Sequence, residues 1–232
     1  MDGPEFGYGE AVDTFRYLVP VNRWFGGIRP IVSFFERESQ TWDGLATYRL
    51  LDAGGGVGDV AEALAQWARR NGHRIRVDLV DRDPSAIKLA GEACRDYPEI
   101  TVTCQDVLEL GGQEYDYVYA SQFLHHFADE EVVPVLRQLL GMCRRKVIVN
   151  DLVRAPLAYA STWFLTLWTS AVFRHDARMS VRRGFRVSEL DGLLRYGGLC
   201  DFILEKHFFY RFLLIVNHGA AERQPDLDST GG

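Results

Sequence analysis

The sequence predicts an α/β fold built on a doubly wound sheet of seven strands, mainly parallel, with an antiparallel last strand. Five apolar, strand-like segments between residues 48 and 152 alternate with helical segments, as in a parallel sheet. Two more strand-like segments near the C-terminus are joined by a short turn, so the last one is expected to run antiparallel. With 232 residues and 47% hydrophobic composition, the chain can bury one full core.

The first strand, turn and helix form the most informative stretch of the chain. An apolar run ends at Asp52, three glycines follow at alternate positions (Gly54, Gly56 and Gly58), and a helix is expected from about Asp59. Glycines let the backbone turn sharply and approach a ligand without interference from a Cβ atom. The free N–H groups and the positive end of the helix face the same space. The stretch therefore predicts a nucleotide-cofactor pocket.

The spacing of the glycines discriminates between cofactors. The dinucleotide fingerprint G-x-G-x-x-G would place a glycine where this chain has Asp59, so the spacing disfavours NAD. The D-x-G-x-G-x-G arrangement from Asp52 to Gly58 resembles motif I of the class I S-adenosylmethionine-dependent methyltransferases. This resemblance implies a Rossmann-like methyltransferase fold and S-adenosylmethionine as the cofactor, with the loop against its methionine part.

The second and third strands end in acidic residues that complete the expected cofactor site. RIRVDLVD ends at Asp81, whose carboxylate can accept both ribose hydroxyls. The nearby Asp83 is the rival ribose ligand, but before Pro84 it fits better as the N-cap of a helix over Pro84 to Ala93. ITVTCQD ends at Asp106, which resembles the family's acceptor for the adenine amino group and is otherwise a turn residue. The expected cofactor-binding residues are Asp52, Gly54, Gly56, Gly58, Asp81, Arg82, Asp106, Val107 and Ser121.

The remaining elements complete the sheet. The fourth strand is YDYVYASQ, a helix is expected around residues 132 to 143, and the fifth strand is KVIVNDL. A helix over Glu189 to Tyr196 is expected to start from a capping box of Ser188 and Asp191. The closing hairpin joins LCDFILEKHFF to RFLLIVN and turns near Tyr210.

Three regions depart from the sheet-forming pattern. Residues 1–44 are expected to form a helical lid, the alternative being an ordinary packing helix, and the string NRWFGG resembles a bacterial subgroup similar to the ubiquinone and menaquinone methyltransferases. The methyltransferase domain is expected to span residues 45–218, with an insertion at about 154–186. Residues 219–232 lack apolar periodicity and are expected to be a disordered tail.

The insertion contains an apolar segment, APLAYASTWFLTLWTSAVF, that is just long enough to be read as a membrane span. Its Ser and Thr residues and Pro156 favour a buried helix without stable membrane insertion. In the resembling superfamily this insertion covers the methyl acceptor, which implies an apolar, aromatic pocket for a small molecule. The expected substrate-binding residues are Trp163, Phe164, Leu167, Trp168 and Phe173.

Three residues are candidates for a general base. The string LHHFADEE resembles a stretch of O-methyltransferases that act on phenols, in which the first histidine removes the proton, and that histidine aligns with His125. The next residue is His126 where those enzymes have Asp, and LHH also occurs in members that methylate carbon. His175, in the insertion, and Asp151, at the end of the fifth strand, are the alternatives.

Composition narrows the partners. The net charge of −6 and pI near 5.5 give no electrostatic footprint for nucleic acid. The four cysteines show no zinc spacing, and no metal is expected, so reduced thiols in a cytoplasmic protein are the prediction. We expect a monomer or homodimer that methylates a phenol or hydroxyquinone-type metabolite on oxygen. Carbon methylation of a quinone or polyketide ring and a non-catalytic cofactor-binding protein stay open, with an NAD-dependent reductase as a weaker choice.

Overall fold

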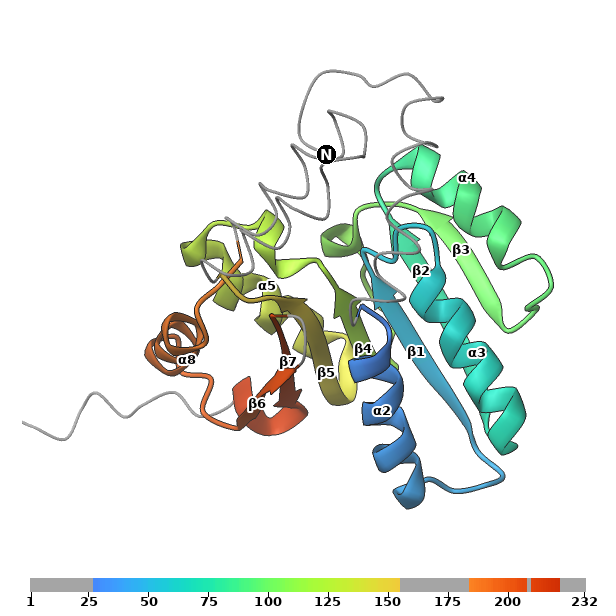
Figure 1. The fold of residues 1–232 in the computed structure, drawn as a ribbon, viewed down its shortest axis with the longest axis horizontal. Helices are drawn as coiled ribbons and strands as arrows, with labels where there is room; N and C mark the ends of the chain where they lie inside the picture. The colour runs from blue at the N-terminus through green and yellow to red at the C-terminus, as the bar shows by residue number, and fades with distance from the viewer. Residues whose placement is uncertain (1–26, 155–183, 208–209, 222–232) are drawn as a thin grey trace, which may run out of the picture.

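The computed structural model describes residues 27–154, 184–207 and 210–221. Among these residues, seven strands form a single sheet in the order β3-β2-β1-β4-β5-β7-β6 (Figure 1). Strands β1 to β5 run parallel, β7 is antiparallel to β5, and β6 is antiparallel to β7. The predicted fold class is confirmed, including the antiparallel last strand.

The strands match the apolar segments closely. Each of the central strands β1, β4 and β5 contains a run of four or more consecutive buried residues because helices cover both faces of the sheet. The bounds are β1 Thr47–Ala53, β2 Arg74–Asp81, β3 Ile100–Cys104, β4 Tyr115–Ser121, β5 Cys143–Leu152, β6 Phe202–His207 and β7 Arg211–Asn217.

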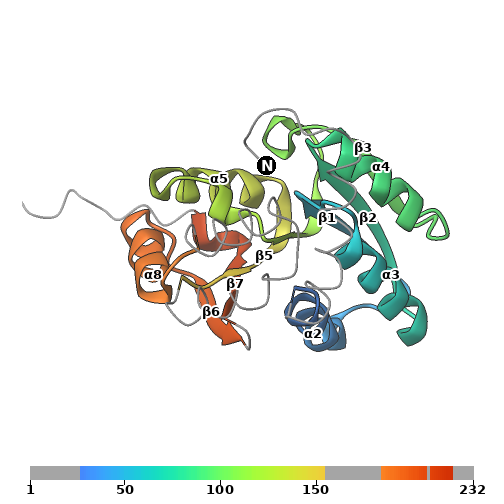
Figure 2. The same ribbon diagram turned by 45° about the horizontal axis from the view of Figure 1, so that its top comes forward.

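Helices cover the two faces of the sheet in separate groups (Figures 1 and 2). One face carries α2 (Arg29–Glu38), α3 (Asp59–Asn71) and α4 (Pro84–Ala93), and the other carries α5 (Asp129–Gly141) and α8 (Val187–Tyr196). Four short 3₁₀ turns are described: η1 Ser39–Thr41, η2 Val107–Glu109, η3 Leu124–His126 and η4 His218–Ala221. Helices α3 and α4 start where the sequence predicted.

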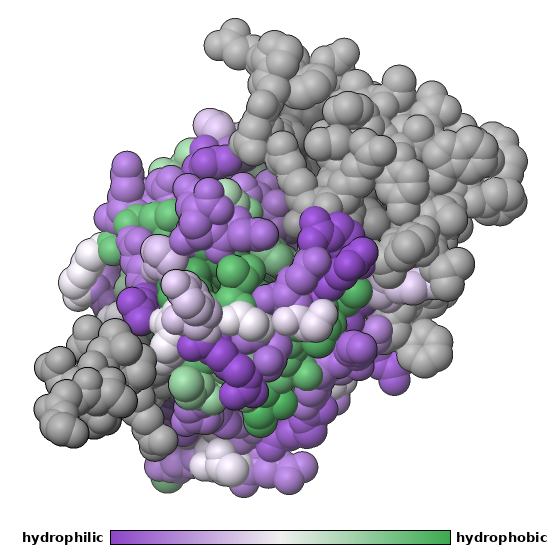
Figure 3. Space-filling view, turned by 90° about the vertical axis from the view of Figure 1, so that its left-hand side faces the viewer, coloured by the Kyte–Doolittle hydropathy of each residue, from purple (hydrophilic) through white to green (hydrophobic). Residues whose placement is uncertain are grey.

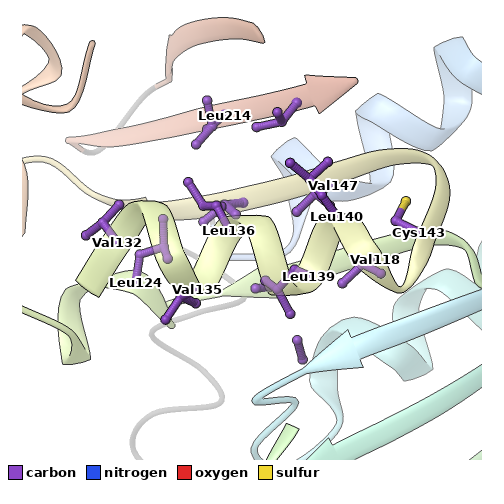
Figure 4. Packing of buried hydrophobic residues seen from close by; sticks show 14 of the residues in the cluster. Val118, Leu124, Val132, Val135, Leu136, Leu139, Leu140, Cys143, Val147 and Leu214 are labelled. Carbon is purple, nitrogen blue, oxygen red and sulfur yellow. The ribbon is translucent and has the colours of Figure 1, made fainter. Parts of the chain in front are cut away.

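Helix α5 fills the core on its face. Its apolar side chains lie over β4, β5 and β7, where Val118, Val147 and Leu214 point toward them (Figure 4). The helix begins three residues earlier than predicted, because the acidic run before Val132 belongs to its first turn. There the carboxylate of Glu131 accepts the Ala128 N–H at 2.8 Å, a favourable arrangement at a positive helix end.

Helix α2 packs on the opposite face as part of the core. Ile31, Phe34 and Phe35 are buried against α3 and the sheet. The Phe35 ring is tilted against Trp67 at a centroid distance of 6.3 Å and lies edge-on to Tyr117 at 5.4 Å. This described part of the predicted 1–44 lid is a packing helix. Residues 1–26 and 222–232 lie outside the described residues, so the lid and the disordered tail remain predictions.

The start of α8 differs from the prediction. The helix begins at Val187 with Arg186 as its N-cap, and the carboxylate of Glu189 accepts the Arg186 N–H at 3.3 Å. Ser188 therefore lies inside the first turn, and the predicted capping box of Ser188 with Asp191 is wrong. The sequence offered two overlapping polar starts, and the chain uses the earlier one because Phe185 is buried in the core just before it.

The side of the molecule that carries α8 and β6 mixes hydrophilic and hydrophobic residues (Figure 3). Tyr196 and Ile203 are exposed there. None of the described helices is both long and apolar enough to cross a membrane. All four cysteines are free: Cys94 and Cys143 are buried, and burial raises the pKa of each thiol to about 11, whereas Cys104 and Cys200 are exposed.

Candidate active site

The predicted site residues gather at the carboxyl edge of the sheet. Strand β1 pairs with β2 on one side and β4 on the other, so the strand order reverses between β1 and β4. Ligands of open α/β sheets bind in the crevice at such a reversal. The ends of β1, β2, β4 and β5 bring Asp52, Asp81, Ser121 and Asp151 to this edge.

The glycine loop turns sharply at this edge. The N–H groups of Gly54 and Gly55 both donate to the Val80 carbonyl, at 2.9 and 3.2 Å. Gly54, Gly56 and Gly58 have φ angles of 68°, 54° and 82°, in the left-handed region that glycine adopts at low cost. The loop therefore requires glycine at the three positions that the sequence pattern picked out.

The space beside each glycine differs. A Cβ on Gly54 would lie 2.6 Å from the Phe123 ring, and one on Gly58 would lie 2.9 Å from the Cys94 sulfur. A Cβ on Gly56 would meet no described atom within 4 Å. Two of the three glycines thus lie against neighbouring side chains, whereas the Cβ position of Gly56 is clear of the described residues; the binding of a ligand by the three glycines stays a prediction.

Asp81 is held against the loop by two backbone amides. Its Oδ2 accepts the Gly56 N–H at 2.8 Å and its Oδ1 accepts the Asp83 N–H at 2.9 Å. A carboxylate offers about four lone-pair sites, so capacity for hydroxyl donors remains. Asp83 accepts the Ser85 N–H at 2.8 Å, which confirms it as the N-cap of α4.

The other predicted cofactor residues lie around the same edge. Asp106 accepts the Leu108 N–H at 2.9 Å and caps η2, so it performs the turn role that was the alternative, and Val107 follows it with a buried side chain. Arg82 is exposed after β2. The Ser121 hydroxyl lies 3.2 Å from the Gly27 carbonyl, next to Asn150, whose amide donates to the same carbonyl at 2.7 Å.

Asp52 is buried beneath the loop. Its Oδ2 has no hydrogen-bond partner among the described residues, and a Cβ on Gly55 would lie only 3.0 Å from it. Tyr119 stands beside it in the register of β1 and β4, fully buried, with a hydroxyl that also lacks a partner in hydrogen-bonding geometry within the described chain. Burial is the main cause that raises the pKa of Asp52 well above its ordinary value; the adjacent Tyr119 hydroxyl lowers this pKa, and the charges of Asp59 and Asp81 raise it further.

His125 and Asp151 form a buried pair, which we call the dyad. Asp151 Oδ1 lies 2.7 Å from His125 Nδ1, and Asp151 also accepts the N–H groups of His125 and Leu152 at 3.1 and 2.7 Å. Burial alone would raise the pKa of Asp151, but His125 and these hydrogen bonds lower it below its ordinary value. An ionised carboxylate only accepts hydrogen bonds, so Nδ1 is the donor to Asp151, and in a neutral His125 ring Nε2 is the nitrogen left to accept a proton.

Sequence reasoning missed Phe123, Tyr119 and Arg211 at this edge. Arg211 begins β7 and is buried. Burial lowers the pKa of its guanidinium to about 10, although the negative charges of Asp151 and Asp59 raise it. The available signal was a single charge at the head of the otherwise apolar run RFLLIVN. Phe123 and Tyr119 gave no such signal, because aromatic residues are common in core strands.

Some predicted residues lie outside the described chain. These are the base candidate His175 and the substrate-binding set Trp163, Phe164, Leu167, Trp168 and Phe173. The described residues that flank the insertion, Val153 and Arg186, line a groove of about 550 Å³ together with Leu204 and Lys206. Within the described residues, no group of three His, Cys, Asp or Glu side chains is arranged to hold a metal ion.

Comparison with known proteins identifies the loop and the sheet around it. Residues 50–146 match the family model of a methyltransferase domain. The matched residues run from strand β1 into strand β5 and leave out both ends of the chain. A match to a methyltransferase domain implies methyl transfer as the activity and S-adenosylmethionine as the cofactor of these residues. No curated protein sequence matches the chain.

Solved structures with this fold share little sequence with this chain. The magnesium protoporphyrin IX methyltransferase from Synechocystis with bound S-adenosylhomocysteine is 18% identical, with a TM-score of 0.58 over 94% of this chain and 90% of that one. The plantazolicin methyltransferase BamL, in complex with a triazolic substrate analogue and S-adenosylhomocysteine, is 15% identical, with a TM-score of 0.67 over 90% and 91%. The citrinin polyketide synthase CMeT domain is 13% identical, with a TM-score of 0.62 over 81% and 51%. At these identities the likeness concerns the fold.

The residues at this edge of the sheet fit S-adenosylmethionine in three respects. No described atom lies within 4 Å of the Cβ position of Gly56, and Asp81 stands beside this glycine with acceptor capacity for two hydroxyls. The Oδ2 atom of Asp52 lies under the same loop and has no hydrogen-bond partner among the described residues, so it is left to interact with a polar group of a ligand. When bound, S-adenosylmethionine supplies an activated methyl group on a positively charged sulfur.

Proposed function

We propose that this chain methylates an oxygen of a small apolar or aromatic molecule, of the phenol or hydroxyquinone type, with His125 as the general base. The observation that carries the proposal is the dyad: a buried carboxylate fixes His125 through Nδ1 and leaves Nε2 to accept a proton. This is the arrangement that a base needs when a hydroxyl acceptor loses its proton as the methyl group arrives.

Asp151 takes a different role from the one first considered for it. It was a candidate base, but its oxygens are occupied by His125 and two backbone N–H groups and it is fully buried. We assign it as a positioning residue that holds the His125 ring and stabilises the positive charge that forms when His125 accepts the proton.

The remaining parts of the chain align the reactants. Asp81 and the loop hold the donor at the ends of β1 and β2, and the dyad stands at the ends of β4 and β5, across the strand reversal. Placing donor and acceptor on the two sides of one crevice converts the transfer into a step between pre-aligned groups. The aromatic segment from Trp163 to Phe173 is the proposed cover of the acceptor, and the protein is proposed to act as a cytoplasmic monomer or homodimer.

The test is turnover of a phenol panel by His125→Ala. Loss of a general base costs about a hundredfold to ten-thousandfold in rate, so kcat should fall by that amount while the Kd of the cofactor changes little. The loss should shrink as pH rises toward the pKa of the acceptor, since a phenolate needs no base. The matched control is His126→Ala: that ring lies tilted against His125 at a centroid distance of 4.2 Å but is exposed, whereas His125 is buried beside Asp151, so kcat should be nearly unchanged.

Asp151→Asn separates positioning from packing. If Asp151 acts through His125, the double variant with His125→Ala should lose no more rate than His125→Ala alone, because residues that act as a unit are non-additive. Near-normal kcat in His125→Ala at neutral pH would contradict the proposal and move the role of base to His175 or to alignment alone. An NMR spectrum of the product that shows a carbon-bound methyl group would replace it with carbon methylation.

A further inference from the structure

Phe123 lies between the two halves of the candidate site. It follows β4, directly before the 3₁₀ turn that carries His125, and its ring lies against Gly54 of the glycine loop, where a Cβ would be 2.6 Å from the ring. The ring is partly buried and packs edge-on against Phe127 at a centroid distance of 5.0 Å. Phe123 therefore contacts the donor side of the crevice and is two residues from the acceptor side.

The backbone before Phe123 is held in an unusual conformation. Gln122 has a φ angle of 56°, in the left-handed region that costs a residue with a side chain about 1 to 2 kcal/mol. Its N–H donates to the Asn150 carbonyl at 2.8 Å, which ties the turn to the end of β5. This turn directs the next side chain back over the glycine loop. The surrounding structure thus enforces the contact between Phe123 and Gly54.

The path of the methyl group brings the sulfur of the donor close to Phe123. The donor is held at the glycine loop, the acceptor at the dyad, and the methyl group has to pass between them, so the positively charged sulfur belongs in the gap that Phe123 adjoins. An aromatic ring attracts a nearby cation through its quadrupole, and the attraction is larger where water is excluded. After transfer the sulfur of the product is uncharged and loses this attraction.

We propose that Phe123 is a specificity-determining residue that selects the charged donor over the uncharged product through a cation–π contact with the sulfonium. The inference rests on the proposed function for the location of the acceptor side. Asp59 and Asp81 also lie near the loop and attract any cation, but neither residue is changed in the Phe123 variants. A variant of Phe123 therefore isolates the ring.

The experiment measures binding without an acceptor, by calorimetry on the full chain. The ligands are S-adenosylmethionine, its amine analogue sinefungin, which carries an ammonium near the sulfonium position, and S-adenosylhomocysteine, which is uncharged there. In Phe123→Leu, the preference for each charged ligand over S-adenosylhomocysteine should fall by about 3- to 30-fold, the range of a cation–π contact. Phe123→Tyr retains a ring and should retain the preference.

Phe127→Leu is the matched control. It removes the ring that packs on Phe123 but has no described contact with the loop, so both preferences should stay within about twofold of the parent. Equal weakening of all three ligands in Phe123→Leu would overturn the proposal and leave a packing role. A lowered preference for S-adenosylmethionine alone, with sinefungin unchanged, would also overturn it, because methyl size and not charge would be the cause. No arm of this experiment uses turnover, so its failure is distinguishable from a failure of His125 as the base.

Discussion

The carboxyl group of Asp52 lies beneath the glycine loop with 1% of the residue exposed, and no described group donates to its Oδ2. Burial raises the pKa of Asp52 in the folded chain above its unfolded value. As pH rises through the unfolded pKa of about 3.9, the unfolded chain releases this proton first. The folded state therefore loses stability from Asp52 as pH rises from about 4 toward the folded pKa.

Asp52→Asn should remove this loss. In the cofactor-free protein at pH 7, we expect the free energy of unfolding of the variant to be about 1 to 3 kcal/mol higher, because the amide does not ionise and so its burial involves no uptake of a proton from solution. The difference should shrink toward pH 4, where both proteins carry a neutral group. Urea unfolding of the two proteins at both pH values measures it. A difference independent of pH, or a less stable variant at pH 7, would show that Asp52 ionises without cost.

At the residue scale, the sequence predicts single positions better than pairs. Asp83 before Pro84 was assigned as an N-cap from two adjacent residues, and the assignment holds because capping is local. The dyad joins residues 26 positions apart. His125 and Asp151 were both candidates, but their contact depends on the pairing of β4 with β5 and on the turn at Gln122, neither of which a local pattern contains.

At the element scale, boundaries were predicted where a strong local signal exists. Helix α3 starts after the left-handed Gly58 and helix α4 after Asp83-Pro84, and both starts were predicted. Helix α8 has two polar candidates for its start, and the choice depends on the burial of Phe185. Tertiary packing therefore determines a boundary wherever local capping signals compete.

Phe35 tests the packing of α2. The residue is fully buried and its ring contacts five aromatic neighbours: Phe34, Trp42, Trp67, Tyr117 and Tyr119. Phe35→Ala should lower the free energy of unfolding by about 3 to 5 kcal/mol, through lost burial and the cavity that remains. Glu36→Ala is the control, since Glu36 is exposed on the same helix and should change stability by less than about 0.5 kcal/mol. A loss below about 1 kcal/mol in Phe35→Ala, measured by denaturant unfolding, would mean that α2 is not part of the core.

At the scale of the whole molecule, strand order determines which residues meet. The reversal between β1 and β4 opens the crevice, and the antiparallel direction of β7 brings Arg211 from the C-terminal hairpin to the same edge. The alternation of strands and helices predicts the sheet because that pattern is periodic along the chain. It does not predict which side chain of a returning strand reaches the edge, since that depends on the register of Leu152 opposite Arg211.

Because the cofactor site joins the ends of several strands, ligand binding should stabilise the whole fold. A ligand that binds only the folded state adds RT ln(1 + [L]/Kd), about 2.7 kcal/mol at a concentration of 100 times Kd. For a chain of this size, 1 kcal/mol shifts Tm by about 2 to 4 °C, so S-adenosylhomocysteine should raise Tm by about 5 to 11 °C.

NAD at the same concentration should leave Tm unchanged, because Asp59 occupies the position of the third glycine in the dinucleotide pattern. Asp81→Ala should need a higher concentration of S-adenosylhomocysteine for the same shift, since it removes the acceptor beside Gly56. The measurement is a thermal unfolding scan. If NAD raised Tm as much as S-adenosylhomocysteine does, the cofactor assigned from the spacing of the glycines would be contradicted.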